Sequence, residues 1–169
     1  MAKLVLTLVG DDRAGLVQAV ADAVALHGGN WERSELAELA GAFAGIVLVS
    51  VPDAGRDALV ADLDALEGLL EITPHTGIAA GDKAEAARFV FTVLGNDRPG
   101  TVRDITHALV RHGLSIDRFT SHTLDAPMAG GTLFEAKISV RVDDGADLAA
   151  ATAELERLAG EIQVDLTVG

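Results

Sequence analysis

The chain has 169 residues, of which 49% are hydrophobic and only 4% aromatic, and it carries no cysteine and a formal net charge of −13. This composition supports an aliphatic core and excludes disulfides, thiolate metal sites and a cysteine nucleophile. The 13 basic residues are scattered among 26 acidic ones, which excludes a basic patch for nucleic-acid phosphates. The first apolar run is too short for a signal sequence or a membrane span, so we expect a cytoplasmic protein without membrane association.

The first half of the chain alternates between strand-like and helix-like hydrophobic periods. An apolar run at 3–9 is followed by helical spacing of Leu16, Val20 and Val24. This helix is expected to end at His27-Gly28, because glycine readily adopts the left-handed conformation after a helix. The other predicted elements of this half are strands at 30–39 and 43–51, joined through Gly41, a helix carrying Leu59, Leu63, Leu66 and Leu70, and a strand at 70–78.

The second half repeats the first in a constant register. Residues 8–15, LVGDDRAG, reappear at 93–100 as VLGNDRPG, an offset of 85. The predicted elements are strands at 88–94, 115–124, 132–142 and 161–168, a helix carrying Val102, Ile105 and Leu109 and ending at His112-Gly113, and a helix carrying Leu148, Ala151, Leu155 and Leu158. The order βαββαβ therefore occurs twice. It predicts an α+β fold of two ferredoxin-like modules, each an antiparallel four-stranded sheet with two helices on one face. We place the first domain at 1–79, a linker at 80–87 and the second domain at 88–169.

The third strands of the two halves differ in polarity. In the second half, apolar residues alternate with polar ones such as Glu135 and Lys137, which is typical of a strand with one wet face. We match these two positions to Ile46 and Leu48, so the strand of the first half is apolar on both faces. Because an apolar face of this kind is normally covered, we expect an interface there with the second module or with a second subunit, and a homodimer as the assembly.

One polar turn recurs between the first strand and the first helix of each half, at 10–15 and 95–100. Unpaired N–H groups and the positive end of the helix dipole favour an anion at such a point, and a glycine lets a ligand approach the backbone. Pro99 fits an early helical position, and Asp12 and Asp97 can cap the N–H groups. The turns predict a site for a carboxylate-bearing ligand, although the same residues also suit a plain helix start.

Other kinds of site have little support in the sequence. The chain has no Walker loop, no dinucleotide-binding glycine pattern, and no pattern of a zinc protease or a serine hydrolase. His27 and His112 fit helix C-termini, where a cation or a donor to the last carbonyls is favourable, better than they fit metal ligation. No catalytic pair of carboxylates stands out. We therefore expect no enzymatic activity, no metal and no cofactor.

The series of strand, Gly-x-Asp-Arg-(Ala/Pro)-Gly, helix and His-Gly within a βαββαβ unit resembles the ACT domain, and its tandem form resembles the family of the glycine cleavage system transcriptional repressor. The resemblance covers nearly the whole chain and departs from the pattern at Ala14. It implies a regulatory protein that binds a small ligand, usually an amino acid, at these turns and acts on a transcription factor or a metabolic enzyme through protein contacts. Carried over by position, the implied ligand-binding residues are Asp12, Arg13, Gly15 and Asn30 in the first half, and Asn96, Asp97, Pro99, Gly100 and Ser115 in the second.

Two other classes of function stay open on the sequence. One is an interaction module that has lost its ligand, which Ala14 and the acidic pair Asp11-Asp12 favour. The other is a ferredoxin-like hydrolase of the acylphosphatase type, in which an Arg and an Asn would hold a phosphate; the repeat argues against it, because no distant Asn repeats with the turn. RNA-recognition modules share this order of elements, but the acidic charge and the scarcity of aromatic residues disfavour them.

Overall fold

A computed structural model of the chain describes residues 1–66, 68–76, 87–126, 130–142, 144–159 and 163–168. The chain divides into two units, Met1–Gly81 (unit 1) and Asp82–Gly169 (unit 2). The predicted linker at 80–87 lies outside the described residues except for Ala87. None of the helices in the described ranges is long and apolar enough to cross a bilayer.

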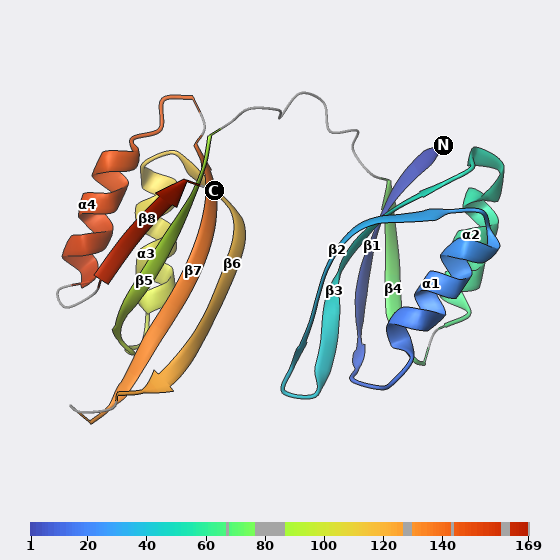
Figure 1. Cartoon of the computed structure of the whole chain (residues 1–169), viewed down its shortest axis with the longest axis horizontal. Helices are drawn as coiled ribbons and strands as arrows, with labels where there is room; N and C mark the ends of the chain where they lie inside the picture. The colour runs from blue at the N-terminus through green and yellow to red at the C-terminus, as the bar shows by residue number, and fades with distance from the viewer. Residues whose placement is uncertain (67, 77–86, 127–129, 143, 160–162, 169) are drawn as a thin grey trace. The chain divides into compact units, whose positions relative to one another are not determined.

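Both units have the order βαββαβ. Unit 1 consists of β1 (Ala2–Asp11), α1 (Leu16–Leu26), β2 (Asn30–Leu39), β3 (Ala42–Val51), a 3-10 turn (Asp53–Gly55), α2 (Arg56–Asp64) and β4 (Glu71–Thr76). Unit 2 consists of β5 (Arg88–Asn96), α3 (Thr101–Arg111), β6 (Leu114–Asp125), β7 (Thr132–Val142), α4 (Leu148–Ala159) and β8 (Gln163–Val168). The strands form antiparallel sheets in the orders β2-β3-β1-β4 and β6-β7-β5-β8, and the helices of each unit cover one face of its sheet (Figure 1). The two predicted ferredoxin-like modules are confirmed.

The core of unit 1 lies between its sheet and its two helices. Its buried residues are Leu4, Leu6, Leu8, Leu16, Val20, Val24, Val47, Val49, Val51, Leu59, Leu63 and Leu70. The stripe predicted for α1 is confirmed, and alternate residues of β1 and β3 complete the layer. The second helix was predicted too long, because α2 ends at Asp64 and the chain then turns, with Gly68 at a φ of 95°. Leu70 still reaches the core from beyond the helix.

Unit 2 has an equivalent core. Its buried residues are Phe91, Val93, Ile105, Ala108, Leu109, Leu114, Phe134, Ala136, Ile138, Val140, Ala151 and Leu155. The prediction that Val102 lies on the buried stripe of α3 is wrong, since this residue is 44% exposed. Thr101, which begins α3, takes the inward place instead, and Ile105 and Ala108 continue its stripe at helical spacing.

Each first helix ends at a histidine followed by a glycine in the left-handed region, with φ of 66° at Gly28 and 75° at Gly113. The prediction that the histidine rings bind the carbonyls of their own helix is wrong. The Nε2 atom of His27 lies 2.7 Å from Oδ2 of Asp62 on α2, and that of His112 lies 2.7 Å from Oε2 of Glu154 on α4. The repeated His-Gly pair therefore marks a polar contact between the two helices of each unit.

Strand register corrects the match between the two third strands. Thr7 pairs with Ile46, and its equivalent Thr92 pairs with Lys137. Ile46 therefore corresponds to Lys137, and by the same register Leu48 corresponds to Ser139 rather than to Lys137. The offset between the units grows from 85 to 91 residues because the connection between β6 and β7 is longer than that between β2 and β3.

The connection between β2 and β3 is a two-residue hairpin, since Leu39 pairs with Ala42. Ala40 and Gly41 both have positive φ, 52° and 84°, the combination found in a type I′ turn. The N–H of Gly41 donates to Oε1 of Glu38 at 2.7 Å. This hairpin holds the loop described next.

Candidate functional site

The two recurring turns are loops that join the central strand of each sheet to its first helix. In unit 1 the loop leaves β1 at Asp11 and enters α1 through Gly15, whose φ and ψ are 90° and −1°. Gly100, the residue before α3, has φ and ψ of 90° and −2°. Because the two glycines have the same conformation, Ala14 in place of Pro99 does not change the backbone at the helix start.

Two predicted roles in these loops are wrong. Pro99 precedes the N-cap residue Gly100 and so lies outside α3. Neither N-cap residue forms a side-chain cap hydrogen bond, and Asp12 and Asp97 lie three residues before the caps. The left-handed glycine, rather than a carboxylate, sets the start of each helix.

A main-chain hydrogen bond fixes each loop against the neighbouring hairpin. The N–H of Asp12 donates to the carbonyl oxygen of Gly41, and the N–H of Asp97 donates to that of Thr132, both at 2.9 Å. The loop is therefore held by the sheet at its strand end and by the helix at the other end.

The first turn of α1 has N–H groups without acceptors in the helix. Its first intrahelical bond runs from the N–H of Ala19 to the carbonyl oxygen of Gly15 at 2.9 Å, so the N–H groups of the three residues before Ala19 have no acceptor within this helix. A methyl group placed on Gly15 would meet no atom within 4 Å. The Cβ position of Gly15 is therefore open, and the positive end of α1 favours an anion.

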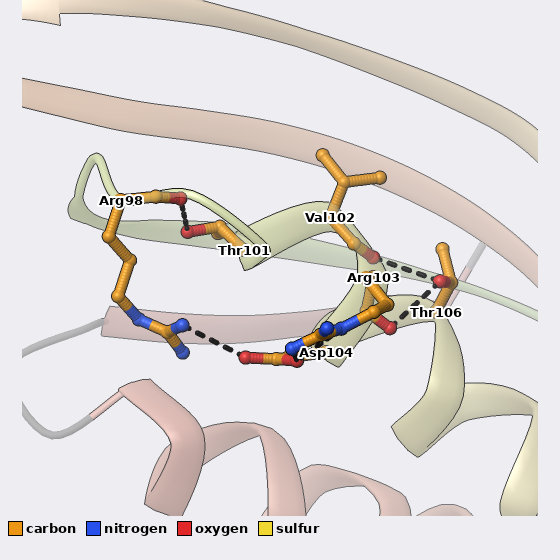
Figure 2. A network of polar contacts seen from close by, with 6 residues as sticks. All are labelled: Arg98, Thr101, Val102, Arg103, Asp104 and Thr106. Carbon is orange, nitrogen blue, oxygen red and sulfur yellow. Dashed lines mark hydrogen bonds and ion pairs between the residues drawn. The ribbon is translucent and has the colours of Figure 1, made fainter.

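In unit 2 the corresponding arginine is held by a carboxylate of the helix (Figure 2). Nη1 of Arg98 lies 2.9 Å from Oδ2 of Asp104, whose other oxygen accepts two bonds from Arg103 at 3.0 and 3.2 Å. These hydrogen bonds, that of Arg98 above all, hold the pKa of Asp104 below its ordinary value. The carbonyl oxygen of Arg98 accepts a further bond from Oγ1 of Thr101 at 2.8 Å.

The loop of unit 1 lacks this internal pairing. At the offset of 85, Gln18 and Ala19 stand where unit 2 has Arg103 and Asp104. Nη2 of Arg13 lies 3.4 Å from Oδ2 of Asp11, and both side chains are mostly exposed, at 55% and 83%. Such an exposed pair contributes little, so an incoming carboxylate can compete for Arg13.

The structure brings together only part of the predicted ligand-binding set. The residues that gather in the loops are Asp12, Arg13 and Gly15 in unit 1 and Asn96, Asp97, Pro99 and Gly100 in unit 2. Asn30 on β2 pairs with Ser50 on β3, and Ser50 pairs with Lys3 on β1. Lys3 lies eight residues before Asp11 on the same strand, so Asn30 is about 27 Å from the loop along the sheet. Ser115 lies equally far from Asn96 on the sheet of unit 2. These two residues belong to the opposite end of their sheets.

Sequence reasoning missed Thr101, Arg103 and Asp104. The spacing Thr101-x-x-Asp104 follows the pattern of residues that begin a helix, and this pattern could have drawn attention to them. The difference from Gln18 and Ala19 would then have shown that the two loops carry different charges.

The remaining predicted site residues lie elsewhere. Ile46 and Leu48 are on β3, on the sheet face opposite the helices; Ile46 is 49% exposed and Leu48 is partly buried. Within the described ranges, no three His, Asp or Glu side chains gather as a metal site would require.

Comparison with known proteins bears on the fold of the whole chain. Models of the ACT domain match residues 2–75 and 89–160. The structure is similar to that of an unknown protein from Galdieria sulphuraria, with 27% identity and a TM-score of 0.85 over 99% of this chain and 98% of that one. It is also similar to a candidate glycine cleavage system transcriptional repressor, with 20% identity and a TM-score of 0.68 over 99% and 98% of the two chains. No curated protein matches.

Proposed function

The chain belongs to the ACT-domain family, and from this premise we propose that it is a non-catalytic regulatory protein that binds a small amino acid at the β1–α1 loop of unit 1. The observation that carries the proposal is the repeated loop, in which Gly15 and Gly100 have the same left-handed backbone at the start of a helix. Binding is passed on by contact with a protein partner, either a transcription factor or a metabolic enzyme.

The chemistry of the loop in unit 1 suits an α-amino acid. The first turn of α1 and the guanidinium of Arg13 attract a carboxylate. The exposed carboxylates of Asp11 and Asp12 lie in the same loop and attract an ammonium group. A ligand that carries both groups on one carbon matches this juxtaposition of charges.

The loop of unit 2 is less suited to a carboxylate. A ligand there would have to displace Asp104 from Arg98 or accept repulsion from its charge. We therefore assign ligand binding to unit 1 and a structural or contact role to the loop of unit 2. An interaction module without any ligand is the second candidate function, because the internal Arg98–Asp104 pair shows one loop that is already satisfied.

The experiment is calorimetric titration of the whole protein with the protein amino acids, after a thermal-shift screen that includes glycine and serine. A ligand that binds the native state raises the melting temperature by mass action. Replacement of Arg13 by Gln should weaken binding of the identified amino acid by about tenfold or more, since it removes a charge-assisted hydrogen bond worth about 1.5–3 kcal/mol.

The matched control is Arg98→Gln, at the equivalent position of unit 2. It should leave the affinity within about twofold of the wild type, because Arg98 is already engaged by Asp104. If no amino acid raises the melting temperature, the proposal fails and the ligand-free module gains support. Equal losses in both variants would remove the assignment to unit 1.

A further inference from the structure

The solvent side of α3 carries two rows of side chains with different chemistry. The first, which we call the apolar row, consists of Val102, Thr106 and Val110, which lie four residues apart and so follow one line along the helix. Both valines are exposed, Val110 to 66%. The hydroxyl of Thr106 donates to the carbonyl oxygens of Val102 and Arg103 at 2.9 and 3.0 Å, so this residue contributes its methyl group to the row (Figure 2).

The second row is basic and runs beside the first. It consists of Arg103, His107 and Arg111, and we call it the basic row. All three residues are exposed, and the two arginine side chains are exposed to 71% and 65%. A shallow hollow between the rows is lined by Thr106, His107, Val110 and Arg111. The exposed surface of α3 is therefore aliphatic on one side and basic on the other.

The carboxylates closest to the basic row are much less exposed than its arginines. Asp104 is bonded by Arg98 and Arg103, and its side chain is only 22% exposed. Glu154 of α4 is bonded by Arg111 at 2.9 Å, and its side chain is only 13% exposed. The guanidinium groups, rather than these carboxylates, therefore meet the solvent along the row.

The other acidic residues that the structure describes on the elements next to α3 lie outside both rows: Asp97, Asp117, Asp125, Asp144, Asp147 and Glu156. Asp97 and Asp125 lie where α3 begins, since both positions pair with Thr132. Asp144 and Asp147 belong to the connection that meets the last turn of α3. Asp117 is bonded by Arg141 at 2.6 Å, and Glu156, two residues from Glu154, does not share its side of α4. Along the rows themselves the exposed charge is positive, in a chain whose net charge is −13.

The equivalent helix of unit 1, α1, has no basic row. At the offset of 85, the positions of that row hold a neutral, an acidic and an aliphatic residue, Gln18, Asp22 and Leu26. The positions of the apolar row hold Val17, Ala21 and Ala25. Because the two units have the same fold, packing of the first helix on its sheet does not need a basic row. The row on α3 is therefore available for another role.

From these observations we infer that α3 is the docking surface for the protein partner, and that the partner supplies an acidic amphipathic helix. The aliphatic side chains of that helix cover the apolar row and enter the hollow. Its carboxylates bind the guanidinium groups of Arg103 and Arg111 in charge-assisted hydrogen bonds. The inference rests on the proposed function for the existence of a partner, and adds the surface and the chemistry of the contact.

The spacing of both rows suits a helix as the occupant. Arg103 and Arg111 are eight residues apart and thus about 12 Å apart along the axis, and carboxylates about two turns apart on a second helix have a similar spacing. Side chains four residues apart, like those of the apolar row, form the ridges by which helices most often pack. A nucleic acid could pair with the arginines but would leave the apolar row uncovered.

The probe is a synthetic peptide of about 20 residues, long enough to form a helix in water, with Leu on one face and Glu along both flanks of that face. Fluorescence anisotropy with the whole protein should show saturable binding of this peptide. The binding should weaken several-fold when the salt is raised from about 50 to about 300 mM, because salt screens exposed charges. The same peptide with Lys in place of Glu should not bind.

Two variants test the two rows separately. His107→Glu places a carboxylate between Arg103 and Arg111 and should weaken binding about tenfold or more, while the new i, i+4 pairs keep the helix stable. His107→Gln is its control and should stay within about twofold of the wild type. Val110→Gln removes an aliphatic side chain from the apolar row and should weaken binding about fivefold to tenfold. Ala25→Gln, at the equivalent exposed position of α1, should have no effect.

A folded wild type that does not bind the acidic peptide overturns the inference, and so does equal binding of the two peptides. Unchanged affinity in His107→Glu and Val110→Gln would place the contact on another surface and overturn it too. A DNA duplex that displaces the peptide at equal concentration would show attraction of any polyanion, which contradicts a helix as the occupant. If His107→Glu changes the mass of the protein in light scattering without peptide, a second copy occupies α3 and the inference is wrong.

Calorimetric titration of the same variants with the amino acid separates this inference from the proposed function. His107→Glu and Val110→Gln should keep the amino-acid affinity of the wild type, because α3 is not part of the loop of unit 1. A wild type that binds no amino acid would contradict the proposed ligand site, whereas the peptide titration alone decides on the docking surface.

Discussion

At the end of α3, the carboxylate of Glu154 on α4 lies close to His112, Arg111 and Arg157. The hydrogen bond of His112 is the largest influence that holds the pKa of Glu154 below its ordinary value of 4.5, and Arg111 and Arg157 add to it. A carboxylate with a lower pKa in the folded chain stabilises the fold above pH 4.5, and this contribution is lost as the pH falls through the folded pKa. We predict that Glu154→Gln makes unfolding less dependent on pH between about pH 5 and pH 3.

The measurement is urea unfolding at a series of pH values, followed by circular dichroism. Glu156→Gln is the control, since it removes an exposed carboxylate of the same helix; its pH dependence should follow that of the wild type. An unchanged acid slope in Glu154→Gln would show that the contact with His112 does not stabilise the fold.

The N-cap glycines are the second feature at this scale. At Gly15 the φ of 90° disfavours any residue with a Cβ, while the space around it is open. Gly15→Ala should therefore lower the free energy of unfolding by about 1–2 kcal/mol through backbone strain alone. Gly15→Asn should lose less, because Asn tolerates the left-handed region better than Ala does. Denaturant melts of the two variants measure the difference, and equal losses would point to a clash instead of strain.

At the scale of elements, the sequence predicted the structure correctly where the spacing of hydrophobic residues and the position of a glycine indicated the same element boundary. The stripe of α1, the order of the elements along the chain and the left-handed glycines after α1 and α3 were all predicted and confirmed. The end of α2 was not predicted correctly, because Leu66 and Leu70 continue the helical spacing although the chain has already turned. The caps at Gly15 and Gly100 were missed because the usual preference for a polar N-cap pointed to the aspartates.

The hairpin between β2 and β3 gives a prediction at this scale. Ala40 holds a positive φ of 52°, which alanine adopts at a cost, in the first position of a type I′ turn. Ala40→Asn should raise the free energy of unfolding by about 1 kcal/mol, because Asn favours this position and Gly41 already occupies the next. Gly41→Ala is the contrasting control and should lower it. If Asn at position 40 brings no gain in a denaturant melt, the turn does not carry the strain that its φ implies.

At the scale of the whole molecule, each unit has a hydrophobic core of its own. We predict that fragments 1–79 and 87–169 each fold when expressed separately, since domains of this size can bury enough surface to be stable. Calorimetry should show one cooperative transition for each fragment. A fragment that melts without a transition would mean that its core depends on the rest of the chain.

The sequence showed that β3 and β7 differ in polarity on the sheet face opposite the helices. It did not show which residues of the two strands correspond. Hydrophobic alternation showed that one third strand is apolar on both sides, and this depends only on local spacing. Lys137 and Ser139 are the counterparts of Ile46 and Leu48 in unit 2. This equivalence follows from hydrogen-bond register, which depends on the length of the hairpin and cannot be read from either strand alone. The ligand-binding set was split for a related reason: Asn30 and Arg13 are near in sequence but lie at opposite ends of one sheet.

The bond from Asp12 to Gly41, and its counterpart from Asp97 to Thr132, join main chain to main chain. No particular side chain has to be kept for the loop to stay where it is. Apart from the left-handed glycines, the residues of the loop can therefore be exchanged one at a time, and a change of ligand preference needs no change of fold. The two units illustrate this point: Arg13 and Arg98 follow equivalent strands on the same loop backbone, and unit 2 alone adds Asp104, which engages its arginine.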